Sequence, residues 1–128
     1  MAICRYFEEL HPEPPLLGTT PREKAHIEQW LRWVEHYFMM PTGMCFQHTS
    51  GYFRDRMNPV KEWGEECGRN VEKFFQFMDE QLADKPYICG DSFTAADINA
   101  FTTLEFNRVN NIRIQPEQKN LQAWYERI

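Results

Sequence analysis

Two acids and two hydroxyls crowd into the segment GDSFTAAD, Gly90 to Asp97, directly before the apolar residues INAF. Such side chains could form a metal site, an acid-base catalytic site or the start of a helix. Capping explains the spacing, because with Thr94 as N-cap the two residues Thr94 and Asp97 can bond to each other's backbone N–H groups as a capping box. Phe93 and Ile98 then occupy the positions of a hydrophobic staple. We therefore predict a structural role for these four residues and assign no catalytic residue.

The cysteines and histidines are the other side chains that could do chemistry, but they are scattered. The chain has no Cys-x-x-Cys pair, and His26 and His36 stand too far apart to hold one metal from the same helical turn. His36 could be proposed as a base, although no partner is visible that would position it. We expect ordinary thiols and no metal site. The residues concerned are Cys4, Cys45, Cys67 and Cys89, with His11, His26, His36 and His48.

Composition limits the classes of protein that fit. A chain of 128 residues is about one domain, and 42% hydrophobic residues are enough for an apolar core. The formal net charge is -5 with both signs interspersed, so we expect no nucleic-acid partner. No apolar run reaches the roughly 18 residues of a membrane span, so we expect no membrane partner, and no secretory signal is visible. These features favour a cytoplasmic location.

Helical periodicity dominates the sequence, and we predict an all-α bundle. The apolar spacing predicts a helix over residues 2–10, a long helix from Pro21 to Met40 with Thr20 as its N-cap, and another from Asn58 to Leu82. Pro41 and Gly43 are expected to interrupt the first long helix, which would then kink or restart over residues 44–53. The helix that begins after Thr94 should be central, with the two long helices antiparallel beside it.

The first long helix has two apolar faces. One face has the spacing of a core stripe, and the other carries His26, Trp33, Tyr37 and Met40, with Met44 just beyond. The second face is either further core or a surface that meets a ligand or a second subunit. Two glycines one turn apart, Gly64 and Gly68, mark either close approach of a neighbouring helix or ligand, or chance.

The segment FMDEQLADKPYICGDSFTAADINAF, residues 77–101, resembles the C-terminal helical domain of cytosolic glutathione S-transferases. AICRYFEEL, residues 2–10, resembles the last helix of that family's N-terminal thioredoxin-like domain. VEHYFMMP, residues 34–41, is similar to phi-like and related bacterial or fungal members, and NLQAWYERI, residues 120–128, is similar to the helix that closes the domain.

The resemblance implies a division of the chain and of the chemistry. Residues 1–20 would be the last helix and linker of a thioredoxin-like domain that is otherwise absent, and residues 21–128 the helical domain. In the family, the thioredoxin-like domain binds and activates the co-substrate glutathione, so we expect this chain alone to be inactive. Both ends fall within helical patterns, which we interpret as a fragment.

Two functions follow from this resemblance. In the first, the chain supplies the apolar wall of the site for a small apolar electrophile and part of a homodimer surface, with Trp33, Tyr37, Met40 and Met44 as the wall. In the second, it is a stand-alone, non-catalytic helical module for association with other proteins. An unrelated helical bundle would explain the periodicity but not the whole signature from Gly90 to Asp97.

Overall fold

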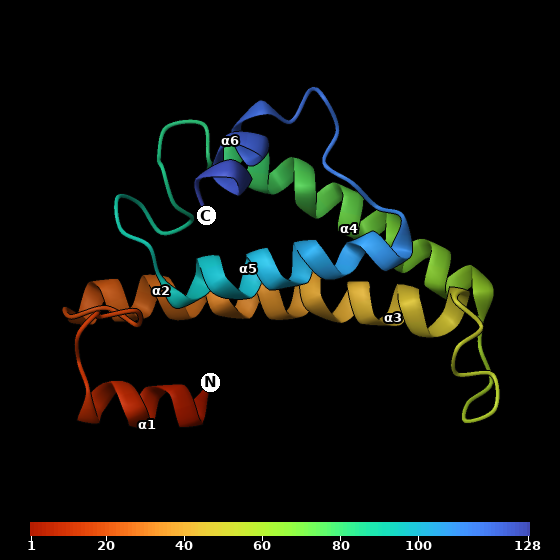
Figure 1. Ribbon diagram of the computed structural model, residues 1–128, viewed down its shortest axis with the longest axis horizontal. Coiled ribbons are helices and arrows are strands. Elements are labelled where there is room, and N and C mark those ends of the chain that lie inside the picture. Colours follow the sequence, from red (N-terminus) through yellow and green to blue (C-terminus); the bar gives the residue numbers. More distant parts are fainter.

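A computed structural model describes all 128 residues and consists of helices joined by turns and loops (Figure 1). The predicted all-α class is confirmed, since the only strand-like pairing is an isolated bridge between Tyr87 and Gly90. The elements are α1 (Ala2–Leu10), α2 (Pro21–Trp33), η1 (Val34–Met39), α3 (Met40–Thr49), α4 (Lys61–Gln81), α5 (Ala95–Phe106), η2 (Asn107–Asn110) and α6 (Lys119–Arg127).

The helix α2 begins where the sequence predicted. Thr20 caps it, its side chain accepting from the N–H of Glu23 at 3.2 Å, while the Glu23 carboxylate accepts from the N–H of Thr20 at 3.0 Å. Pro21 occupies the first turn, where its missing N–H costs nothing. Hydrogen bonds from Thr19 and Thr20 lower the pKa of Glu23 to about 2.

The first long helix is interrupted and restarts, but the interruption precedes Pro41 and Gly43, which lie inside a helix that continues to Thr49. Between α2 and α3 the chain forms η1, a π-helical segment in which the N–H of Met40 bonds to the carbonyl of Glu35, five residues back. Pro41 follows in the first turn of α3 and lacks an N–H. The change of hydrogen-bond register lets α2, η1 and α3 form one rod (Figure 1).

The second long helix, α4, begins at Lys61 rather than at the predicted Asn58. Val60 is extended and its N–H donates to Nδ1 of His48 at 2.9 Å, so the chain is tied to α3 before helical geometry begins. A Cβ on Gly64 would lie 2.6 Å from Thr49 Cγ2, and one on Gly68 3.3 Å from Cys45 Sγ. The alternative of close helix approach is therefore confirmed for this glycine pair.

The central position of α5 is visible in Figure 1, where it runs along the rod formed by α2, η1 and α3. Ala96 and Ala100 are fully buried in it, and their small side chains permit close packing. α6 packs on α4 and brings Leu121 and Trp124 into the same core. The bundle therefore has one apolar core around α5.

α1 lies apart from this core. None of its residues is buried, and Arg5 pairs with Glu28 of α2 at 2.7 Å, while Glu8 accepts from the N–H of Leu17 at 2.7 Å. Ile3 is 73% exposed.

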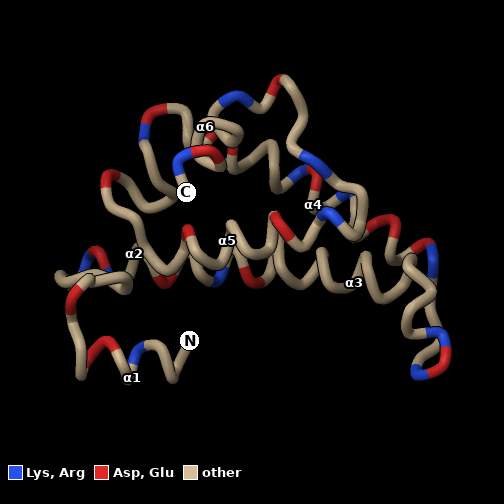
Figure 2. Tube along the Cα trace, viewed as in Figure 1, with Lys and Arg blue, Asp and Glu red and all other residues tan.

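Figure 2 shows acidic and basic residues distributed over all parts of the chain. No helix combines the length and hydrophobicity that a membrane span requires.

Candidate functional site

A groove of about 770 Å³ lies between the rod of α2, η1 and α3 and the helix α4. All four residues predicted as an apolar wall, Trp33, Tyr37, Met40 and Met44, line it. They stand at intervals of three or four positions, so they lie along one face of the rod. The structure therefore brings the predicted residues together at one concave surface.

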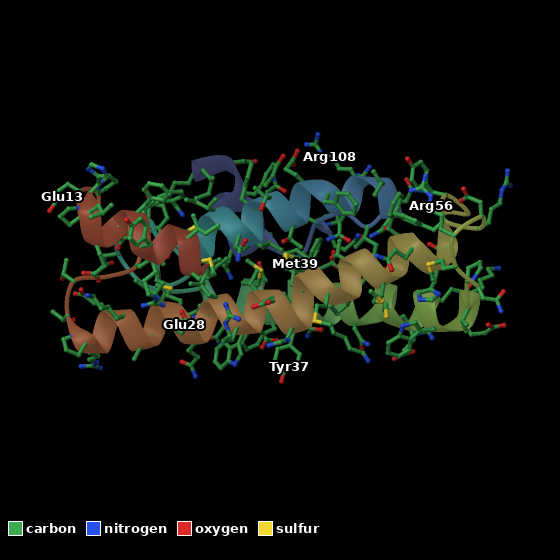
Figure 3. The ribbon with its side chains drawn as sticks, turned by 90° about the horizontal axis from the view of Figure 1, so that it is seen from below. Glu13, Glu28, Tyr37, Met39, Arg56 and Arg108 are labelled. Atoms are coloured by element: carbon green, nitrogen blue, oxygen red, sulfur yellow. The ribbon has the colours of Figure 1, made fainter.

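Antiparallel pairing of the rod with α4 fixes which residues face each other. The rings of Trp33 and Phe77 are 5.7 Å apart at one end, and His48 lies against Gly64 at the other. Trp30 packs edge-on against Trp33 at 5.1 Å and joins the groove to the core. Figure 3 shows Tyr37 pointing away from α5, so this groove opens on a face that α5 does not cover.

The opposite wall of the groove comes from α4, and the sequence interpretation missed it. Its members recur every three or four positions, which is the spacing of one helical face and was a readable signal. The groove-facing stripe of α4 was not predicted because it lies beside the core-facing stripe of the same helix. The wall consists of Trp63, Cys67, Asn70, Lys73, Phe74 and Phe77.

The lining of the groove is mainly aromatic and apolar. No Asp or Glu lines it, and its polar groups are His36, the Tyr37 hydroxyl, Asn70 and Lys73. Burial raises the pKa of the Cys67 thiol, which therefore remains protonated at neutral pH and is a poor nucleophile. Aromatic and methionine side chains provide flat and adaptable contacts.

The cluster that includes Thr94 and Asp97 forms the predicted capping box. The Asp97 carboxylate is fully buried, and its Oδ2 accepts from the N–H of Thr94 at 2.9 Å and the Thr94 hydroxyl at 3.0 Å. Its Oδ1 accepts from the N–H of Ile88 and from Nε1 of Trp124, both at 2.9 Å. All these partners belong to the chain itself, so the carboxylate has the environment of a structural anchor.

The hydrophobic staple between Phe93 and Ile98 stays a prediction. The Phe93 ring lies edge-on to Tyr87, with centroids 5.9 Å apart, and both staple residues are more than a third exposed, at 38% and 42%.

No group of three His, Cys, Asp or Glu side chains is arranged to hold a metal ion. The four cysteines are free thiols.

Comparison with known proteins gives this helical architecture a family. The family model for the glutathione S-transferase C-terminal domain matches residues 34–128. The chain is 32% identical to glutathione S-transferase 2 of Saccharomyces cerevisiae over 129 residues, which is 99% of this chain. The crystal structure of Gtt2 from Saccharomyces cerevisiae superposes with a TM-score of 0.92 at 30% identity over 98% of this chain. A glutathione S-transferase domain-containing protein from Marinobacter aquaeolei gives a TM-score of 0.91 at 27% identity over 98% of this chain.

The helical bundle is therefore that of the glutathione S-transferase C-terminal domain. The chain belongs to the glutathione S-transferase family and contains its C-terminal domain. It spans 55% of the length of the yeast glutathione S-transferase 2, and 62% of each of the two solved chains.

Proposed function

We propose that this chain is the helical part of a glutathione transferase and that the groove beside Tyr37 is the wall of its site for a small apolar electrophile. The observation that carries the proposal is the convergence of Trp33, Tyr37, Met40 and Met44 on one groove in a member of this family. A flat, carbon-rich electrophile would be held by aromatic and thioether contacts. Holding it in place lowers the entropic cost of attack by a thiolate.

Glutathione, the co-substrate, would be held and activated by a thioredoxin-like domain outside these 128 residues. Residues 1–20 would be the last helix and linker of that domain, and residues 21–128 the helical domain. The exposed apolar side chains of α1 support this division, because Ile3 is 73% and Phe7 55% exposed. An apolar helix face of this kind is typical of an element that packs against another domain. The free thiols suit a cytoplasmic setting.

We propose that the transferase forms a homodimer. The second candidate function is association with other proteins without catalysis. The observation that favours association is the exposure of large groove residues: Tyr37 is 61%, Trp63 51% and Met40 50% exposed. Exposed apolar side chains gathered on one surface are typical of sites that meet a ligand or another protein. Sedimentation across micromolar to millimolar protein should show dimers, and a strict monomer would contradict the association.

A chimera tests the catalytic proposal. The segment of yeast glutathione S-transferase 2 that precedes the matched region would be fused to this chain, which superposes on Gtt2 with a TM-score of 0.92. We expect conjugation of glutathione to an aryl halide. Tyr37→Ser should raise KM for the aryl halide about three- to tenfold while KM for glutathione changes little, because the tyrosine ring contacts only the apolar substrate.

The matched control is Val109→Ser, which removes an apolar side chain that is 54% exposed in η2, outside the groove. It should leave both KM values unchanged. Two results would contradict the groove as the electrophile site. One is an equal change in KM for both substrates, and the other is an active chimera in which Tyr37→Ser leaves KM for the aryl halide unchanged. A folded chimera without any conjugation would favour the association module.

A further inference from the structure

Two of the four free thiols meet where α3 and α4 approach each other. Cys45 and Cys67 stand 22 positions apart in the sequence, and we expected them to be ordinary thiols. In the structure a Cβ on Gly68, the residue next to Cys67, would lie only 3.3 Å from the Sγ of Cys45. Burial raises the pKa of the Cys67 thiol, and the nearby Cys45 raises it further. The fold therefore pairs these two thiols across the contact between the helices.

The antiparallel register of α3 and α4 produces this pairing. Cys45 lies against Gly68, and one turn further along α3, His48 lies against Gly64. The two glycines have no side chain, so the backbones come close at this level. Because the gap is narrow, even the short side chain of cysteine reaches across it.

The paired thiols are shielded from water but lie beside an entry path. Cys45 is 6% and Cys67 2% exposed. Cys67 also lines the groove, so a small ion can reach its sulfur from that side. No carboxylate lines the groove there, and the neighbouring Met44 offers a soft thioether rather than a hard oxygen. The pair is therefore accessible to a cation that prefers sulfur.

The number of ligands limits which cation fits. A structural Zn(II) site requires four ligands, and no group of three His, Cys, Asp or Glu side chains is gathered anywhere in the chain. A pair of thiolates satisfies a soft cation of low coordination number, such as Cu(I) or Hg(II).

Charge decides between these two cations. A Cu(I) ion on two thiolates leaves a net negative charge, which is costly in a buried place. Burial raises the pKa of Cys45, and the negative charge of Glu72 adds to the rise. Burial likewise raises the pKa of Cys67, with the Glu66 carboxylate as a smaller cause. Further negative charge is therefore unfavourable here, whereas a divalent cation on two thiolates forms a neutral complex.

We infer that Cys45 and Cys67 form a binding site for a soft divalent cation of the Hg(II) class, held as a neutral bis-thiolate between α3 and α4. Each thiol releases its proton to water as its sulfur bonds to the metal, so one Hg(II) replaces two protons and nothing is oxidised or reduced. The second bond forms within the chain, which makes the pair a stronger ligand than two separate thiols. The site needs no glutathione and is independent of the proposed transferase function.

Mercuric chloride added to the full chain in excess mercaptoethanol tests the inference. A single protein thiol loses Hg(II) to the added monothiol, whereas a chelating pair retains it. We expect one retained Hg(II) per chain. Digestion of the unmodified chain followed by mass spectrometry should find this ion joining the peptide that contains Cys45 to the peptide that contains Cys67, with two protons lost. This measurement requires no variant, so it does not depend on how a variant folds.

The alanine variants test each ligand separately. Cys45→Ala and Cys67→Ala should each weaken retention of Hg(II) against mercaptoethanol at least about tenfold, with unchanged helical circular dichroism, because the remaining sulfur binds alone. Cys89→Ala, which removes a half-buried thiol elsewhere, is the matched control and should leave retention unchanged.

Three results would overturn the inference. The first is complete loss of Hg(II) from the unmodified chain to mercaptoethanol, which would mean single-thiol binding only. The second is a bridged pair of peptides that includes Cys4 or Cys89, or equal weakening by Cys89→Ala. The third is retention of Zn(II) from zinc chloride as firmly as Hg(II), which would contradict the argument from ligand number.

Discussion

The indole Nε1 of Trp124 donates a 2.9 Å hydrogen bond to Oδ1 of Asp97, joining residues 27 positions apart in two different helices. Both side chains are fully buried. The same oxygen accepts from the N–H of Ile88, so one carboxylate connects α5, the turn before it and α6. Asp97 is therefore a tertiary anchor as well as the cap of its own helix.

Replacing this anchor should destabilise the whole bundle. In Asp97→Asn an NH₂ group replaces one oxygen, so at least one buried donor of Thr94, Ile88 or Trp124 loses its acceptor. Hydrogen bonds to charged groups contribute about 1.5–3 kcal/mol each, and we expect a loss of about 3 kcal/mol in the free energy of unfolding. Denaturant unfolding followed by circular dichroism measures it.

Thr94→Ala is the milder companion, because it removes the hydroxyl and leaves the carboxylate and its other donors in place. The expected loss is about 0.5–2 kcal/mol. Equal losses for Thr94→Ala and Asp97→Asn would mean that the capping box alone accounts for the role of Asp97, against the tertiary anchor described above.

The contrast between Thr94 and Trp124 shows what the sequence could predict. The capping box depends on residues three positions apart, and local spacing was sufficient to predict it. The bond to Trp124 is a contact between distant segments, and no local pattern indicates it. The groove was predicted on the rod side, where the second face of the first helix is apolar. Its α4 wall was missed because Trp63 and Phe77 lie beside a core stripe of the same period.

The register change in η1 was missed for a related reason. Proline at position 41 predicts a break by local rules. Packing of the rod against α4 and α5 stabilises a continuous helix instead, with Phe38 fully buried just before the proline. Tertiary packing therefore outweighed the local preference.

A second cap is supplied from another helix. The side chain of Gln118, the N-cap of α6, does not cap the helix, while Oδ1 of Asp79 in α4 accepts from the N–H of Leu121 at 2.8 Å. Asp79→Ala should cost about 0.5–2 kcal/mol in the free energy of unfolding and increase hydrogen exchange in α6. Asp84→Ala, at an exposed position without such a bond, is the control. Unchanged exchange in α6 after Asp79→Ala would contradict this cap.

Two glycines in helices should respond to alanine with opposite signs. At Gly64 a new Cβ would lie 2.8 Å from His48 Cβ, so the helices must separate, and we expect a loss of about 1–3 kcal/mol. At Gly43 nothing lies within 4 Å of the new Cβ, and alanine should stabilise the helix by up to about 1 kcal/mol. Thermal unfolding of both variants measures the difference, and a stabilised Gly64→Ala variant would disprove close contact between α3 and α4.

Stability should fall in alkaline solution through Cys89. Burial raises the pKa of its thiol from 9.0 to about 11, partly offset by a hydrogen bond with Thr94. The folded state therefore binds the proton more tightly than the unfolded state, and this contribution is complete below pH 9 and lost as the pH rises to 11. Because the side chain is partly exposed, we expect about 1 kcal/mol. Denaturant unfolding of Cys89→Ala should show a shallower decline between these pH values, and identical slopes would rule out this cause.

Titration calorimetry of the 128-residue chain with glutathione is the most direct test of the proposed division of function. We propose that a domain outside this chain captures glutathione and that the groove beside Tyr37 holds the apolar ligand. The groove has apolar walls and no anchor for a charged tripeptide's ammonium group, since no carboxylate lines it. We predict no saturable heat with glutathione up to millimolar concentration. Saturable glutathione binding that Tyr37→Phe or Met40→Asp abolishes would contradict it, because this chain would then carry the chemistry assigned elsewhere.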